Sequence, residues 1–171
     1  MLLPQGVILK YLKSFPDERG IFTELYRESW IKDTEYIQWN VVNSKARVFR
    51  GVHLHIKHFD YLSIMKGRAI FGLHDMRRNS PTYQLSAMVE LNESKPGTLI
   101  IPPGVAHGFY FFEASTHIYA VSEYWNTDDE LGCHFLDEHL KLDWPDKKPI
   151  LSLHDKNLST YEQLLQKFHE I

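Results

Sequence analysis

The chain has 171 residues, of which 43% are hydrophobic and 13% aromatic, enough apolar side chain to bury the core of one domain over residues 1–171. Its 19 Lys and Arg and 22 Asp and Glu give a net charge of −3, which leaves no electrostatic basis for binding nucleic acid or an anionic membrane. No segment approaches the roughly 20 apolar residues of a membrane helix, and no signal peptide is recognisable. A single cysteine, Cys133, excludes an internal disulfide. We therefore expect a cytoplasmic protein without nucleic-acid or membrane partners.

Short β-branched and aromatic runs, separated by turn residues, dominate the chain and predict strands. The turns lie at 16–20, 78–81, 94–97 and 102–104, where proline, glycine, asparagine and aspartate cluster. The spacing predicts an all-β fold, a cupin-like jelly-roll β-barrel with a few short flanking helices. The expected strands span 6–11, 20–24, 37–44, 48–55, 59–66, 68–75, 84–91, 97–101, 106–111, 116–122 and 132–135.

Two short helices and one irregular segment complete the expected architecture. We predict a helix over 24–32 and a C-terminal helix over 159–169, with Ser159 as the residue that caps its first turn. The segment 143–155 contains Trp-Pro and Lys-Pro pairs and predicts an ordered strap across the barrel.

The most unusual strand is Arg50-Gly51-Val52-His53-Leu54-His55. Alternation along a strand predicts Arg50 and Leu54 on one face, and Gly51, His53 and His55 on the other. A cation, a glycine and two imidazoles within six residues indicate the wall of a polar cavity. Such a cavity holds either a metal ion or a substrate that loses a proton.

A metal site is one interpretation of this cavity. His53, His55 and Asp60 have the spacing of the first cupin motif, with aspartate in place of the usual glutamate. The segment from Gly97 to His107 nearly reproduces the second motif and is one residue short before the proline. Three imidazoles and one carboxylate suit Fe, Mn, Ni or Zn. A metal-dependent cupin isomerase or oxygenase is therefore an alternative function.

Six motifs, taken in order, give a second interpretation. With these six motifs, the chain resembles the dTDP-4-dehydrorhamnose 3,5-epimerases. These are metal-free cupins that invert stereocentres beside the 4-keto group of a nucleotide sugar. The resemblance runs from about Phe15 to Asp155. Its motifs lie at 16–24, 38–44, 50–53, 77–83, 101–109 and 144–155.

The resemblance implies roles for three residues in catalysis. His53 matches the catalytic base, Asp155 matches the carboxylate that hydrogen-bonds its other ring nitrogen, and Tyr119 matches the general acid. A 4-keto group delocalises the carbanion formed when a proton leaves C3 or C5, so no cofactor and no metal are expected. The family also implies a homodimer.

The resemblance further implies a set of residues that bind the nucleotide-diphosphate sugar, on dTDP or GDP. Arg50 matches an arginine near the diphosphate, and His107 matches a histidine that lines the same cavity. The whole predicted substrate-binding set is Arg19, Phe22, Glu24, Gln38, Asn40, Arg50, His55, Asp60, His107 and Trp125.

Two positions depart from the family pattern and leave the substrate open. Asp60 stands where a lysine usually contacts the developing enolate, so we expect His55 or Lys57 to donate instead, Asp60 to bind a sugar hydroxyl, or the reaction to be narrower. Trp125 replaces a tyrosine. The substrate is therefore open to a different 4-keto deoxy sugar or a heptose, and the reaction to epimerisation at C3 or C5 alone. A non-catalytic cupin that binds a sugar nucleotide is a further alternative.

Overall fold

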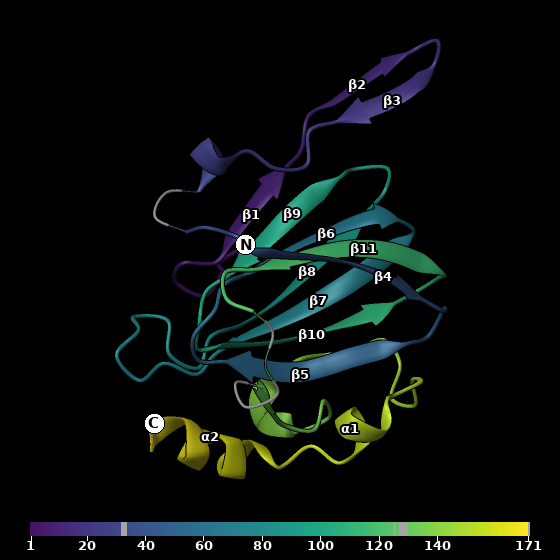
Figure 1. Ribbon diagram of the computed structural model, residues 1–171. Helices are drawn as coiled ribbons and strands as arrows, with labels where there is room; N and C mark the ends of the chain where they lie inside the picture. Colours follow the sequence, from purple (N-terminus) through teal and green to yellow (C-terminus); the bar gives the residue numbers. More distant parts are fainter. Residues whose placement is uncertain (32–33, 125, 127–129, 171) are drawn as a thin grey trace.

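Two five-stranded antiparallel sheets form the body of the protein, as Figure 1 shows for the computed structural model. The structure describes residues 1–31, 34–124, 126 and 130–170, so Trp125 lies outside the described residues. The expected all-β jelly-roll class is confirmed. Among the described helices, none has the length and apolar character needed to cross a membrane.

The strands of each sheet follow the order expected for a jelly roll, in which neighbours along the chain often lie in opposite sheets. The first sheet has the order β1-β9-β6-β11-β4, with β1 at Ile8–Tyr11, β4 at Gln38–Ser44, β6 at Asp60–Lys66, β9 at Gly97–Ile101 and β11 at Ser115–Val121. The second has the order β12-β5-β10-β7-β8, with β5 at Phe49–His55, β7 at Arg68–Asp75, β8 at Ser86–Asn92, β10 at Val105–Phe111 and β12 at Glu130–Gly132.

A separate two-stranded hairpin, β2 (Ser14–Asp17) and β3 (Gly20–Thr23), extends away from the barrel near the N-terminus (Figure 1). The sequence predicted a turn at 16–20 followed by a strand at 20–24, so β3 was expected and β2 was not, because Pro16 and Asp17 are typical turn residues. The observed turn is shorter, and Pro16 pairs with Ile21 inside the ladder.

The helices are shorter than predicted or begin elsewhere. The helix expected over 24–32 is a single 3₁₀ turn, η1 (Glu28–Trp30), whose N-cap Arg27 provides no side-chain cap. A second 3₁₀ turn, η3, spans Glu138–Leu140. Helix α2 runs Tyr161–His169 and begins after Thr160 rather than Ser159. The reason is a capping box between Thr160 and Gln163, whereas Ser159 donates its hydroxyl to the carbonyl of Gly132 at 2.8 Å.

The predicted strap over 143–155 lies against the outer face of the second sheet. Trp144 is fully buried there and packs edge-on against Phe49, with ring centroids 4.6 Å apart. Gly72 leaves room for this indole, since a Cβ at that position would come within 2.6 Å of it. The strap ends in a short helix that was not predicted, α1 (Leu153–Lys156), which Ser152 caps. Packing of Trp144 therefore determines where α1 reaches the barrel.

An extra residue in β5 changes which side chains face the cavity. Pairing with β10 joins His53 to His107 and Arg50 to Phe109, so three steps on β5 oppose two steps on β10. Gly51 adopts a φ of +104° in this bulge. The expected separation of Arg50 from the two histidines is therefore wrong, because the bulge inverts the alternation and brings all three to the cavity wall.

Candidate active site

A cavity of about 550 Å³ opens between the two sheets, within the size range of small-molecule sites. Both sheets, β12 and the end of the strap contribute to its wall. Seven of the residues predicted from sequence line it: Arg50, His53, His55, Asp60, His107, Tyr119 and Asp155. The cavity is thus built from segments up to about a hundred residues apart, and its wall contains six imidazoles.

The histidine–carboxylate pair expected from the sequence is formed. The Nε2 atom of His53 lies 2.8 Å from Oδ1 of Asp155, a hydrogen-bond distance. Asp155 is buried in α1, and its backbone N–H donates to the Ser152 hydroxyl, which fixes the turn. Burial opposes ionisation of Asp155, but the hydrogen bond and charge of His53, with smaller contributions from Ser152 and His154, hold its pKa below the usual value. The carboxylate therefore stays ionised beside the imidazole.

The second ring nitrogen of His53 faces another carboxylate. Its Nδ1 atom lies 3.3 Å from Oε1 of Glu130, which β12 places directly across from His55 on β5. Both ring nitrogens of this half-exposed histidine are therefore next to an acid. Sequence reasoning missed Glu130, because its acidic neighbours Asp128 and Asp129 make the run resemble an exposed loop.

Tyr119 stands on β11 of the opposite sheet and lines the same cavity. Burial raises the pKa of its phenol, and the charges of Asp60 and Glu130 add to this effect. Tyr119 therefore keeps its proton at neutral pH. The imidazole of His117, a second unpredicted wall residue, stacks beside it, and burial together with the charge of Arg50 lowers the pKa of His117 to about 4.

A separate cluster surrounds Asp60, which is 5% exposed on β6. Three imidazole Nε2 atoms approach its carboxylate: His55 at 3.9 Å, His58 at 3.7 Å and His107 at 3.7 Å. His58 was not predicted, since its spacing matches no cupin motif. Lys57, one of the expected donors, is exposed and lies outside the cavity wall.

Two groups of described residues have the geometry to hold a metal ion, and neither is the set expected from sequence. One contains His53, His154 and Asp155, and the other contains His55, His58 and Asp60. The metal ligands expected from sequence, His53, His55, Asp60 and His107, therefore do not form one group. His53 lies with Asp155, and His55 and Asp60 lie with His58.

The remaining predicted substrate residues lie away from the cavity wall. Arg19 and Phe22 are on the projecting β2–β3 hairpin, where Arg19 pairs with Asp17, and Glu24 pairs with Arg27. Gln38 donates to Asn40 at 3.0 Å on β4. These two share a strand face with Val42, which does line the cavity.

Comparison with known proteins identifies the same family as the motifs. The family described as dTDP-4-dehydrorhamnose 3,5-epimerase matches residues 3–163. A dTDP-4-dehydrorhamnose 3,5-epimerase of Neisseria gonorrhoeae is 31% identical over 94% of this chain, and the chain spans 51% of that relative's length.

Solved structures extend the similarity to the fold. The dTDP-4-dehydrorhamnose 3,5-epimerase of Bacillus anthracis with TDP and pyrophosphate bound superposes with a TM-score of 0.85 at 29% identity, covering 91% of this chain and 94% of the other. The dTDP-6-deoxy-D-glucose-3,5-epimerase of Legionella pneumophila in complex with dTDP-4-keto-L-rhamnose gives 0.87 at 27% identity, covering 95% and 91%. Because the matched segment, the barrel and the order of the motifs agree, the chain belongs to the dTDP-4-dehydrorhamnose 3,5-epimerase family of isomerases, as its sequence predicted.

Proposed function

We propose that this protein epimerises C3, C5 or both of a nucleoside-diphosphate 4-keto sugar, by removing a proton and returning one to the opposite face. The observation that carries the proposal is the 2.8 Å contact between His53 and Asp155 in the wall of a cavity that Tyr119 lines from the other sheet. Base and acid on facing sheets fit a reaction that needs proton transfer from both sides of one carbon.

In this proposal His53 removes the proton through Nδ1, because Asp155 occupies Nε2. Asp155 accepts the Nε2 hydrogen, keeps the lone pair on Nδ1 and stabilises the imidazolium that forms. Glu130 now stands at Nδ1, so the bound sugar takes the place of its carboxylate. The substrate's own ketone receives the electron pair as an enolate.

Tyr119 then returns a proton to carbon from the facing sheet. Its raised pKa keeps the phenol protonated at neutral pH, so that a proton is present to be transferred to the basic enolate carbon. The Tyr119 phenolate that results is neutralised by solvent before the next turnover.

We propose a thymidine diphosphate as the carrier of the sugar, because the Bacillus anthracis relative holds TDP and the Legionella pneumophila relative holds dTDP-4-keto-L-rhamnose. Arg50 is the one Lys or Arg among the described residues of the cavity wall, and it is oriented by a 3.1 Å hydrogen bond to Ser44. A diphosphate binds beside this guanidinium. GDP is the competing carrier.

We also propose a homodimer in which the β2–β3 hairpin of one copy lies against the other. On this hairpin Ile21 is 73% exposed and Phe22 is 65% exposed, a degree of apolar exposure that marks contact surfaces. Light scattering should give twice the chain mass, and Ile21→Ser should shift the protein toward monomer. A wild-type monomer contradicts the dimer. We further propose that residues 1–171 act as one domain, since both sheets and the strap build one cavity. We propose the cytoplasm as its location, in line with the single cysteine.

Solvent exchange tests the reaction directly. Incubation in D₂O with a 4-keto sugar on dTDP or on GDP should place deuterium at C3, C5 or both, as measured by NMR. His53→Asn should abolish the exchange, whereas Tyr119→Phe should retain exchange and lose inversion. Absence of exchange with either carrier, while the protein still binds the nucleotide, would identify a binding protein instead of an enzyme.

A further inference from the structure

His117 is a buried imidazole of the cavity wall that lacks a hydrogen-bond partner within the described residues. Its side chain is 1% exposed on β11, and it lines the cavity. Its Nδ1 atom is buried without a partner in the described part of the chain. An unpaired buried polar atom costs stability, which a bound molecule offsets when it supplies the partner. Because the ring borders the cavity, that molecule is a ligand of the cavity.

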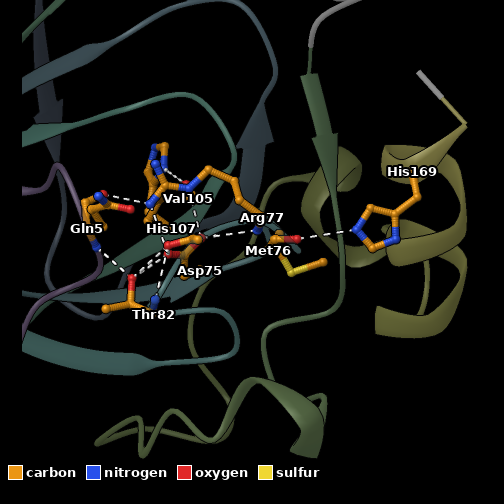
Figure 2. A network of polar contacts seen from close by, with 9 residues as sticks. Gln5, Asp75, Met76, Arg77, Thr82, Val105, His107 and His169 are labelled. Atoms are coloured by element: carbon orange, nitrogen blue, oxygen red, sulfur yellow. Dashed lines mark hydrogen bonds and ion pairs between the residues drawn. The ribbon is translucent and has the colours of Figure 1, made fainter.

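His107, another buried imidazole of the same wall, shows what His117 lacks. The Nδ1 atom of His107 lies 3.1 Å from the carbonyl oxygen of Val105, a contact drawn in Figure 2. The fold thus pairs one nitrogen of His107 and fixes its tautomer. The cross-strand neighbours of His117 are Val42 on β4 and Ile64 on β6, and neither side chain can form a hydrogen bond. The polar atoms of His117 therefore depend on what the cavity holds.

Aromatic side chains hold the His117 ring in one orientation. Phe111 stacks on it with ring centroids 5.3 Å apart and an interplanar angle of 29°, and Phe109 meets it edge-on at 5.4 Å. Tyr119 lies next to it on the same face of β11, with ring centroids 6.2 Å apart. Since this packing closes off Nδ1, the Nε2 edge is the polar edge that the ring presents to the cavity.

The neutral form of His117 offers the cavity one hydrogen-bond donor. Burial, together with the charge of Arg50, lowers the pKa of His117 to about 4, so the ring is uncharged near pH 7. A neutral imidazole carries a hydrogen on one nitrogen only. Nδ1 faces no acceptor among the described residues, so the hydrogen belongs on Nε2. The ligand atom that pairs with it is therefore an acceptor, which in a nucleotide sugar is an oxygen.

The guanidinium of Arg50 approaches the same place from the facing sheet. Its Nε–H donates to the Ser44 hydroxyl at 3.1 Å, which leaves the terminal nitrogens for a ligand. Ser44 pairs with Ser115, two residues before His117, so Ser44 and His117 are diagonal neighbours on one face of the β4–β11 pair. Such neighbours stand about 7–8 Å apart, within reach of long side chains. Arg50 and His117 are therefore placed to bind one group between them.

We propose that His117 binds the diphosphate of the substrate together with Arg50, by donating its Nε2 hydrogen to an anionic phosphate oxygen. The identity of this ligand, a nucleoside-diphosphate sugar, rests on the proposed function. The charge of Arg50 favours a phosphate over a sugar hydroxyl at this position, because a guanidinium pairs with two phosphate oxygens at once. The neutral imidazole adds a hydrogen bond to the phosphate without adding a second positive charge to the cavity.

Equilibrium binding of a nucleoside diphosphate to the full chain tests this contact without turnover. The probe is thymidine diphosphate or guanosine diphosphate, whichever the wild type binds more tightly by titration calorimetry. His117→Phe keeps the stack on Phe111 and removes both nitrogens, so its affinity for the diphosphate should be lower by about 10–100-fold. Its affinity for the matching nucleoside, which has no phosphate, should equal that of the wild type by ligand-observed NMR.

Two further variants identify the nitrogen that acts. His117→Gln places an amide N–H near the position of Nε2, whereas His117→Asn places one near the position of Nδ1. We expect His117→Gln to recover most of the lost affinity and His117→Asn to bind as weakly as His117→Phe. Thr116→Val is the matched control on the opposite face of β11, where Thr116 donates to Asn43, and it should bind as the wild type does. Thermal melting confirms that each variant is folded.

Three results would overturn the inference. Unchanged affinity for the diphosphate in folded His117→Phe would show that His117 does not touch a phosphate. A loss that affects the sugar nucleotide alone would assign His117 to a sugar hydroxyl. A wild type that binds neither diphosphate would have no phosphate for His117 to contact. Deuterium exchange measures the proposed reaction separately: a protein that needs His117 to bind the diphosphate and exchanges no deuterium would retain this contact and lose only the epimerase function.

Discussion

Strand β5 presents two histidines to one cavity, and each meets a carboxylate in a different way. His53 is half-exposed and lies at hydrogen-bond distance, 2.8 Å, from Asp155. His55 is buried, and its Nε2 atom stays 3.9 Å from Asp60. The same pair of residue types thus forms a hydrogen bond at one position and stands beyond hydrogen-bond distance two residues later.

The elements that deliver the two carboxylates cause this difference. Asp155 comes from α1, a short turn that Ser152 caps at the end of a strap that Trp144 anchors. Asp60 comes from β6, where backbone pairing with Ile101 and Val121 fixes it in the sheet. The close pair therefore joins a strand to a helical turn, whereas His55 and Asp60 both lie on strands of the barrel.

Asp155→Asn is expected to have the largest effect. An amide in place of the carboxylate removes the negative charge that stabilises imidazolium and disturbs the tautomer of His53, so turnover should fall by about 10²–10⁴-fold. The measurement is the initial rate of deuterium incorporation. Asp143→Asn, at a fully exposed carboxylate, is the matched control and should leave the rate unchanged.

Gly51→Ala tests the bulge that brings Arg50 and both histidines to the cavity. The φ of +104° is unfavourable for alanine, and its Cβ would lie 2.7 Å from the backbone oxygen of His107. We expect a loss of stability of about 2–4 kcal/mol by urea unfolding. Gly20→Ala, at φ +138° with no atom within 4 Å, is the control and should lose only the smaller cost of the backbone conformation. Equal losses would remove close packing as the reason for Gly51.

Sequence patterns predicted the parts of the molecule that depend on local periodicity. All eleven expected strands overlap observed ones in the two main sheets and the hairpin, because alternation and turn residues report directly on pleated structure. The predictions that were wrong concern helix ends, whose positions depend on tertiary contacts. Thr160 replaced Ser159 as the cap because Ser159 has a partner in Gly132.

For the site, order along the chain was sufficient to find His53, Asp155 and Tyr119 but not their surroundings. The bulge at Gly51 adds one residue to β5, and no period of two detects such an insertion. His58 and Glu130 enter the cavity through a loop and a three-residue strand, where side-chain direction depends on packing. Sequence motifs therefore predicted the cavity residues that belong to a motif, and they missed those that reach the cavity only through the folding of the chain.

The smallest expected effect is the loss of folding stability at acid pH, which buried imidazoles should cause. Burial lowers the pKa of His74 and of His117 to about 4, against 6.5 for the ordinary side chain. Between these values the unfolded chain binds a proton that the folded chain does not, so stability is complete above pH 6.5 and falls as the pH drops toward 4. Each group contributes about 1.4 kcal/mol per pH unit at most.

Urea unfolding at steps from pH 7.5 to 4.5, with EDTA present, measures this slope. His117→Phe removes one titrating ring while keeping the stack on Phe111, so its slope should be lower by about one proton. The lowered pKa of Asp155 keeps its own contribution below this window, because its stabilisation is lost only as the pH falls through that value. A His117→Phe slope equal to that of the wild type would show that His117 already binds its proton in the folded protein, and burial would then not distinguish the two kinds of imidazole in this cavity.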